Sequence, residues 1–136
     1  MLFRSITTAF AKVGLSGDYG GTYFLTHLLG SAKARELYLM SPVLTAQEAL
    51  ALGIVTRVVS DAEIDAAAHD LAMSLAQGPS ITLGYIKRNI NNAERLSLEN
   101  CFDAEAFHHS RAGETADHKE AAKAFVEKRK PVFKNH

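Results

Sequence analysis

The sequence is poor in the features that define secreted, membrane and nucleic-acid-binding proteins. Its single cysteine, Cys101, excludes an internal disulfide. The 15 basic and 15 acidic residues cancel, so no net field draws the chain toward nucleic acid or a lipid surface. No apolar run approaches the roughly 20 residues of a membrane span, and residues 1–5 lack the charged lead of a signal peptide. With 47% hydrophobic residues, the composition predicts a packed, cytoplasmic type of protein.

The sequence also gives little support for a metal site or a reactive cysteine. Six histidines are present, but no two of them stand in the His-x-x-x-His spacing that places two ligands on one helix face. Cys101 falls on the apolar face of a predicted helix, which is typical of a buried, inert thiol. We therefore predict no metal site and no reactive cysteine.

Residues 14–22 form the most distinctive stretch, because they hold four of the nine glycines and the carboxylate of Asp18. Their spacing matches neither the P-loop nor the Rossmann fingerprint. An apolar segment begins at Tyr23, so a helix should start just after this turn. Two interpretations of Asp18 remain open: it caps that helix, or the turn holds it close to a ligand as an acid or base. In the second case, Tyr19, Tyr23 and Phe24 would supply an apolar wall that raises its pKa.

Apolar periodicity and capping residues predict a mainly helical chain. Capping boxes are expected at Thr45–Glu48 and Ser60–Glu63, and Ser80 is expected to cap a further helix. Helices are predicted over 23–29, 32–40, 46–52, 61–77, 81–94, 97–110 and 115–129, with a break at Gly30, and short strands over 2–10 and 54–59. Inward-facing residues are expected at Leu98, Cys101, Phe102, Ala106, Ala121, Ala124 and Phe125.

Two short strands cannot cover so many amphipathic helices. The fold class we predict is therefore mostly α with one or two short strands, as the helical part of a larger α/β protein or of a tight assembly. Near the C-terminus the chain is locally basic and carries Phe125. This pattern fits either a solvated helix face or a contact to phosphate and adenine.

Four stretches together resemble the crotonase, or enoyl-CoA hydratase/isomerase, superfamily. They are the Gly-rich turn within residues 10–22, the small-residue helix 30–37, the segment 44–59 and the ending 124–131. The resemblance implies the C-terminal part of a crotonase-like α/β spiral fold. Residues 1–60 would end the spiral core and carry the active-site turn, and residues 61–136 would form a helical oligomerisation region. The family's oxyanion-hole amides belong to the other half of the fold, so this chain is expected to be a fragment or a short form and to be inactive alone.

The same resemblance assigns roles to individual residues. Asp18 matches the position where some isomerases keep an acid or base, with Gly17, Tyr19 and Tyr23 lining the substrate. Phe10 stands where a hydratase has one of its two glutamates, and it cannot transfer a proton.

At the C-terminal end, Phe125 and Lys128 match contacts to coenzyme A. The implied partners are an acyl-CoA substrate and further copies of the chain, in a trimer or hexamer. No metal or redox cofactor is implied, since coenzyme A is part of the substrate. The alternative is a non-catalytic helical assembly module that pairs with a full-length relative.

Overall fold

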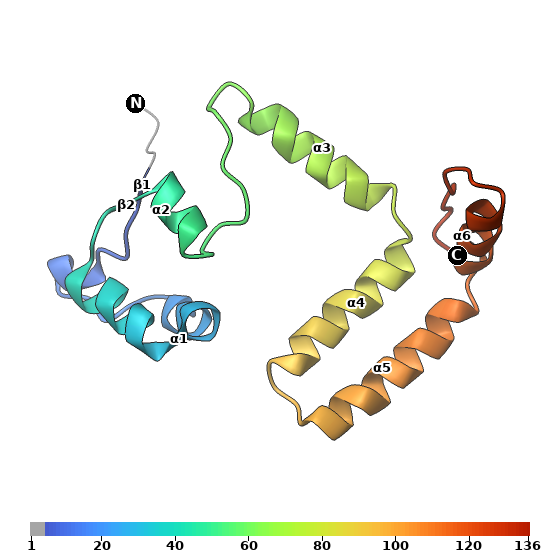
Figure 1. Ribbon diagram of the computed structural model, residues 1–136. Helices are drawn as coiled ribbons and strands as arrows, with labels where there is room; N and C mark the ends of the chain where they lie inside the picture. Colours follow the sequence, from blue (N-terminus) through green and yellow to red (C-terminus); the bar gives the residue numbers. More distant parts are fainter. Residues whose placement is uncertain (1–4) are drawn as a thin grey trace. The chain divides into compact units, whose positions relative to one another are not determined.

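The computed structural model describes residues 5–136 and divides the chain into two compact units, with the boundary between Ile64 and Asp65 (Figure 1). The first unit contains β1 (Ser5–Ile6), the 3-10 helix η1 (Phe10–Val13), α1 (Gly21–Met40), β2 (Leu44–Thr45) and α2 (Ala46–Ala51). Next come α3 (Ile64–Ala76), α4 (Ser80–Ala93), α5 (Leu98–Gly113) and α6 (Ala116–Val126). Within the described residues, the expectation of a mostly helical chain with short strands is confirmed.

The capping box predicted at Thr45–Glu48 sets a helix boundary, whereas the one predicted at Ser60–Glu63 is not completed, because the Glu63 backbone N–H donates to the Ser60 carbonyl and not to its hydroxyl. At the start of α2, the Glu48 backbone N–H donates to Thr45 Oγ1 at 3.2 Å. The Glu48 carboxylate accepts in return from the Thr45 backbone N–H at 2.7 Å, which completes the capping box. At the starts of α5 and α6, the hydroxyls of Ser97 and Thr115 each accept from the backbone N–H three residues on, without the reciprocal bond. These boundaries depend only on residues three positions apart, which is why the sequence reveals them.

The predicted strand over 54–59 is wrong, because this segment is irregular. The strand that forms instead is β2, which pairs antiparallel with β1 so that Ser5 lies opposite Thr45 and Ile6 opposite Leu44. A strand needs a neighbour for its backbone N–H and C=O groups, and β-branched composition alone does not supply one. Of the strand predicted over 2–10, residues 2–4 lie outside the described residues.

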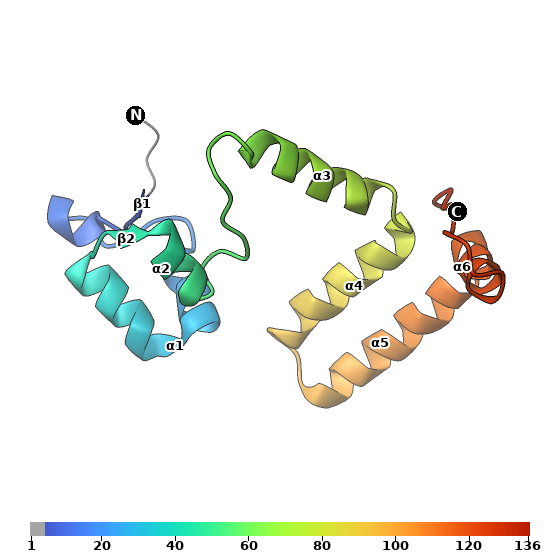
Figure 2. The same ribbon diagram turned by 45° about the horizontal axis from the view of Figure 1, so that its top comes forward.

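Helix α1 breaks at Gly30, as predicted, where φ is 78° and ψ is 160°. Figure 2 shows the two halves of this helix running in different directions. The C-terminal half supplies Ala34 and Leu37 to the small core of the first unit, and α2 supplies Ala49. The Thr8 hydroxyl donates to the Leu37 carbonyl at 2.7 Å and ties the segment before η1 to this half of α1.

In the second unit, the segment after α6 folds back and forms hydrogen bonds with α6 and with the start of α4. The buried carboxylate of Asp117, on α6, accepts from the backbone N–H groups of Lys134 and Asn135 at 2.7 and 2.9 Å. The Asn135 side chain then accepts from the Ser80 backbone N–H at 2.8 Å, at the start of α4. The predicted cap by the Ser80 hydroxyl is therefore wrong, because a residue 55 positions away caps this end of α4 instead.

Helices α4 and α5 run side by side in both ribbon views, yet no residue of α3, α4 or α5 is buried (Figures 1 and 2). Leu98, Phe102 and Phe125 were expected to face inward, but their exposed fractions are 68%, 60% and 84%. Ala124 is buried, as expected.

The chain exposes 10441 Å². A folded monomer of this mass exposes about 7,000 Å², and two separate domains of half the mass about 8,400 Å² together. The chain therefore presents more surface than a pair of independent small domains.

Candidate active site

The candidate site begins at the Gly-rich turn, where Asp18 lies between two glycines with left-handed backbone. Gly17 has φ 133° and Gly20 has φ 103°, conformations that residues with a side chain rarely adopt. Gly20 is the N-cap of α1, and no side chain caps this helix. The interpretation of Asp18 as a helix cap is therefore wrong, and its carboxylate is exposed rather than tied to the helix.

The Asp18 carboxylate converges with the Tyr38 hydroxyl in front of Gly21. A Cβ placed on Gly21 would stand 3.0 Å from Asp18 Oδ1 and closer still to the Tyr38 hydroxyl oxygen. A side chain at this position would therefore force the Tyr38 hydroxyl to shift and would stand tightly against Asp18 Oδ1. Because both oxygens border one small gap, the two side chains form a single polar cluster.

The kink at Gly30 creates this cluster. In a straight α-helix, the 17 steps from Gly21 to Tyr38 would separate the two residues by about 26 Å. The break instead turns the C-terminal half of α1 back toward the start of the helix. A Cβ at Gly30 would meet nothing within 4 Å. Glycine is therefore favoured there by its positive φ and not by a close contact with another residue.

The Tyr38 ring is held on two sides. It stacks on Phe10 of η1 with ring centroids 6.1 Å apart and an interplanar angle of 10°. Its Cε1 atom also lies 3.7 Å from the place of a Cβ on Gly17. Burial raises the pKa of the Tyr38 hydroxyl, and the negative charge of Asp18 raises it further. The hydroxyl therefore stays protonated and can donate a hydrogen bond.

Tyr38 was missed at the sequence level. In the sequence, Tyr38 follows the apolar pattern of a helix, between Leu37 and Leu39, and nothing marks it as a site residue. The only signal for its role is the break at Gly30, which folds its half of the helix back.

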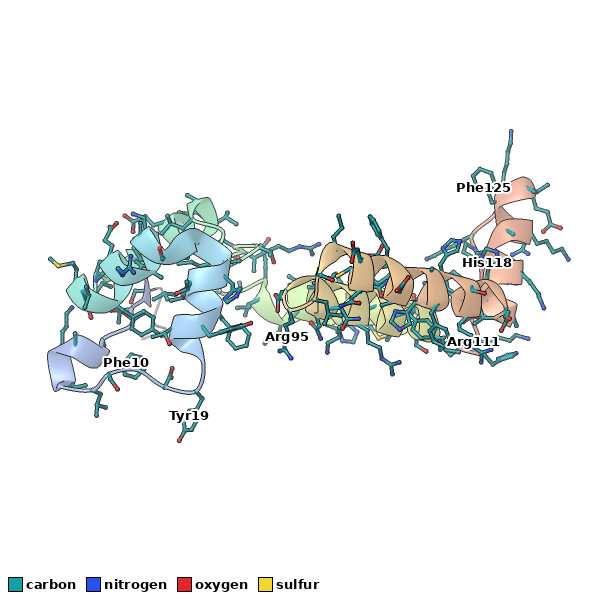
Figure 3. All side chains as sticks on the ribbon, turned by 90° about the horizontal axis from the view of Figure 1, so that it is seen from below. Phe10, Tyr19, Arg95, Arg111, His118 and Phe125 are labelled. Carbon is teal, nitrogen blue, oxygen red and sulfur yellow. The ribbon has the colours of Figure 1, made fainter. Side chains whose placement is uncertain are left out.

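The aromatic residues beside the turn do not enclose Asp18. Tyr19 is fully exposed, and Figure 3 shows its side chain projecting away from the ribbon. The Tyr23 ring packs on His27, with centroids 4.0 Å apart, and meets Phe24 edge-on at 5.5 Å. Both Tyr23 and Phe24 remain exposed. The expected apolar wall around the carboxylate is therefore not formed by these three side chains.

The residues predicted to contact coenzyme A lie at the end of α6, in the second unit. Phe125 is 84% exposed and projects from the helix end in Figure 3. Lys128 follows the helix with a left-handed φ of 53°. The next residue, Arg129, donates to the Glu120 carboxylate at 2.5 and 3.0 Å and to Glu127 at 2.6 Å. The Arg129 guanidinium is thus occupied, whereas no ion pair found in residues 5–136 uses Lys128.

These ionic contacts shift the proton affinity of Glu120. The hydrogen bonds from the Arg129 side chain, and then the one from the Val132 backbone N–H, lower the pKa of Glu120 to about 2. Glu120 is therefore ionised at neutral pH. Together with Glu127 it engages Arg129 beside the turn at Lys128.

The described part of the first unit holds an apolar cavity of about 40 Å³, lined by residues that include Leu25, Leu37 and Ile54. Pockets for small molecules are usually 300–1,000 Å³, so this cavity is too small for an acyl-CoA. Across residues 5–136, no three or more histidine, cysteine or acidic side chains gather as metal ligands. Within the same range, no helix combines the length and apolar character needed to cross a membrane.

Comparison with known proteins gives one consistent result. The sequence profile of the enoyl-CoA hydratase/isomerase family matches residues 4–136. The chain is 40% identical over 125 residues to 1,2-epoxyphenylacetyl-CoA isomerase from Escherichia coli K12, covering 92% of this chain and 48% of that protein. It is 32% identical over 126 residues to short-chain-enoyl-CoA hydratase from Clostridium acetobutylicum, covering 90% and 48%.

The crystal structure of an enoyl-CoA hydratase from Polaromonas sp. JS666 superposes with a TM-score of 0.90 at 30% identity, covering 96% of this chain and 51% of that one. The chain thus spans about half the length of the curated relatives it matches.

Proposed function

Because the chain belongs to the enoyl-CoA hydratase/isomerase family, we propose that it supplies one half of the active site of an acyl-CoA enzyme of this type. The observation that carries the proposal is the family match over residues 4–136, which includes the turn with Asp18. The other half of the site, with the two backbone amides that the resemblance assigns to the oxyanion hole, would come from the part of the fold outside this match.

In the complete site, two N–H donors would polarise the thioester carbonyl and stabilise an enolate. Asp18 would take a proton from one carbon of the acyl chain and return it to another. This half of the site offers one suitable carboxylate, because Phe10 occupies the position of the hydratase glutamate and stacks on Tyr38 instead. The arrangement supports isomerisation through one acid/base group better than hydration through two. Gly17, Tyr19 and Tyr23 would line the substrate around Asp18.

We assign coenzyme A binding to the end of α6. Phe125 presents an exposed ring for the adenine, and Lys128 offers an ammonium group outside the Arg129 ion pairs for a phosphate. No metal or redox cofactor is needed for a proton transfer of this kind, and coenzyme A enters with the substrate. We further propose a role in fatty-acid metabolism and a cytoplasmic location, which the acyl-CoA chemistry and the disulfide-free composition support.

Assembly with further copies of the chain, as a trimer or hexamer, is part of the proposal. The support is the apolar surface of α3, α4 and α5, where large side chains such as Ile64, Leu75 and Ile90 are between 54% and 60% exposed. Helices of 13 to 16 residues are marginal in water unless tertiary packing covers their apolar faces. The helical region 61–136 would therefore be the oligomerisation region and residues 1–60 the part that carries the site.

A non-catalytic assembly module is the second candidate. It is favoured by the half-length match and by the small cavity in the described part of the first unit, which is too small to hold an acyl-CoA. Such a module would use its helices to pair with a full-length relative.

A chimaera separates the two candidates. This chain replaces the matching 125 residues of the Escherichia coli isomerase, and turnover of acyl-CoA is measured for the parent chimaera, Asp18→Asn and Asp103→Asn. Asparagine keeps the size of aspartate but cannot exchange the proton, so Asp18→Asn should lower turnover by about 10²–10⁴-fold with little change in acyl-CoA affinity. The Asp103 control on α5 should retain full turnover.

An active chimaera with unchanged turnover in Asp18→Asn would contradict the catalytic assignment. If the chimaera is inactive and the unmodified chain co-purifies with the intact isomerase, the assembly module becomes the better explanation.

A further inference from the structure

The cluster in front of Gly21 contains a group that the proposed reaction does not yet use, the Tyr38 hydroxyl. It borders the same gap as Asp18 Oδ1, although the two residues come from different segments of the first unit. Tyr38 is partly buried, whereas Asp18 is exposed on the turn. An exposed loop carboxylate has no fixed orientation of its own, so a neighbouring donor on a packed ring can set which oxygen faces the substrate.

The ring of Tyr38 is well placed to act as a rigid support. It is stacked on Phe10 and lies over Gly17, and the adjacent Leu37 is buried in the core. Its hydroxyl keeps its proton under physiological conditions, because both burial and the charge of Asp18 raise the Tyr38 pKa. A protonated phenol donates to a carboxylate, and hydrogen bonds to ionised groups are the stronger ones.

We propose that Tyr38 is a positioning residue for Asp18: its hydroxyl donates toward the Asp18 carboxylate across the gap at Gly21 and orients it for proton transfer. This inference rests on the proposed function for its catalytic consequence, but the Tyr38–Asp18 pair itself does not. The alternative is that Tyr38 only packs under the turn, in which case its ring matters and its hydroxyl does not.

The first test measures the pair directly in the 136-residue chain. Tyrosine is labelled with ¹³C at Cζ, and the four resonances are followed by NMR as the pH rises, with Tyr38→Phe used for assignment. Tyr38 should titrate above the ordinary tyrosine value of 10.0, and Asp18→Asn should lower the Tyr38 pKa by removing the nearby charge. The control Asp65→Asn, on α3, should leave it unchanged.

Two results of this titration would overturn the proposal. One is a Tyr38 pKa that does not respond to Asp18→Asn, and the other is a wild-type chain in which all four tyrosines titrate together. Neither result depends on enzymatic activity, so the pair can fail while the proposed function stands.

The second test asks whether the hydroxyl acts through Asp18. In the active chimaera, Tyr38→Phe keeps the stacked ring and removes one hydrogen bond to a charged group, which should lower kcat by about 10- to 100-fold with little change in KM. The double variant Asp18→Asn/Tyr38→Phe should be no slower than Asp18→Asn alone, because the two residues act as a unit.

Full activity in Tyr38→Phe, or losses that multiply in the double variant, would assign Tyr38 to packing alone. If Asp18→Asn itself retains activity, the proposed function fails instead, and the titration still decides whether the pair exists.

Discussion

The two units use similar helices but differ in what those helices bury. In the first unit, the second half of α1 and α2 bury Ala34, Leu37 and Ala49 against the folded-back chain, and Ser41 is buried beside them. In the second unit, α3, α4 and α5 bury no residue, and the buried positions belong to α6: Asp117, a carboxylate that holds the returning tail, and Ala124.

This difference separates helix formation from helix burial. Backbone hydrogen bonds within a helix are local, so both units form regular helices. Covering an apolar face requires a second element packed against it. In the first unit, the kink at Gly30 and the segment around Thr8 fold the chain back on α1. In the second unit, α4 and α5 pack side by side but leave many of their large apolar side chains exposed. The second unit presents exposed apolar helix faces, and the first presents the polar cluster of Asp18 and Tyr38.

The two units should differ most in their response to assembly. We expect the chain to sediment at a multiple of 14.8 kDa, and Ile90→Glu to weaken that association by roughly 100-fold or more. The reason is that a charge would replace an exposed apolar side chain on α4 and would be buried unpaired in the interface. Sedimentation equilibrium over a dilution series measures the effect.

The matched control is Asn91→Glu, which adds the same charge at the next, polar and exposed position of α4. It should leave the association constant nearly unchanged. A monodisperse 14.8 kDa wild-type chain at micromolar concentration would refute the proposed oligomer.

A smaller effect, on the free energy of unfolding, is expected when a helix glycine of each unit is replaced by alanine. Gly21→Ala forces a Cβ against the Tyr38 hydroxyl and the Asp18 carboxylate. Overpacking costs about 1–3 kcal/mol, and the gain in helix propensity returns about 0.5–1 kcal/mol, so we expect a net loss of about 1 kcal/mol. In Gly84→Ala, on α4, the new Cβ meets nothing within 4 Å. That variant should gain about 0.5–1 kcal/mol.

Urea unfolding of both variants at one protein concentration checks the opposite signs. Equal stabilisation by the two substitutions would show that the Tyr38 hydroxyl and the Asp18 carboxylate do not crowd Gly21 in solution.

The smallest effect concerns acid sensitivity, which we compare at one glutamate of each unit that accepts a hydrogen bond from a backbone N–H, Glu120 and Glu48. In the second unit, the pKa of Glu120 lies at about 2, below the usual 4.5, chiefly because of Arg129. A lowered folded-state pKa means that the Glu120–Arg129 contact stabilises the fold above pH 4.5, and that this contribution is lost as the pH falls from 4.5 to about 2. In the first unit, the hydrogen bond from the Thr45 backbone likewise lowers the pKa of Glu48.

Backbone amide shifts report the two glutamates separately, because Val132 N–H donates to Glu120 at 3.1 Å and Thr45 N–H to Glu48 at 2.7 Å. Arg129→Gln should move the Val132 midpoint up toward the ordinary glutamate value and leave the Thr45 midpoint in place. An unmoved Val132 midpoint would contradict the role given to Arg129.

Much of the fold was predictable because it depends on neighbours in the sequence. The Thr45–Glu48 capping box and the break at Gly30 follow from residues a few positions apart. The strand predicted over 54–59 was wrong because a strand depends on a distant partner, and β1 pairs with β2 instead. The inward faces predicted for Leu98 and Phe102 were wrong for the same reason, since nothing in the described chain covers them.

For the candidate site, the sequence indicated the turn and Asp18, and the resemblance indicated Phe125 and Lys128. It could not indicate Tyr38, whose importance arises only when α1 folds back. The coenzyme A contacts and the assembly remain predictions.

The sequence by itself determined most of the helices, the Thr45–Glu48 capping box, the glycine turn and the family, because these follow from local hydrogen bonding, backbone conformation and residue patterns. Only the tertiary structure decided that Asp18 is not a cap, that Tyr38 and Asp18 share the gap at Gly21, and that Asn135 caps α4. These contacts join residues 17 to 55 positions apart, and their geometry depends on how the chain turns between them.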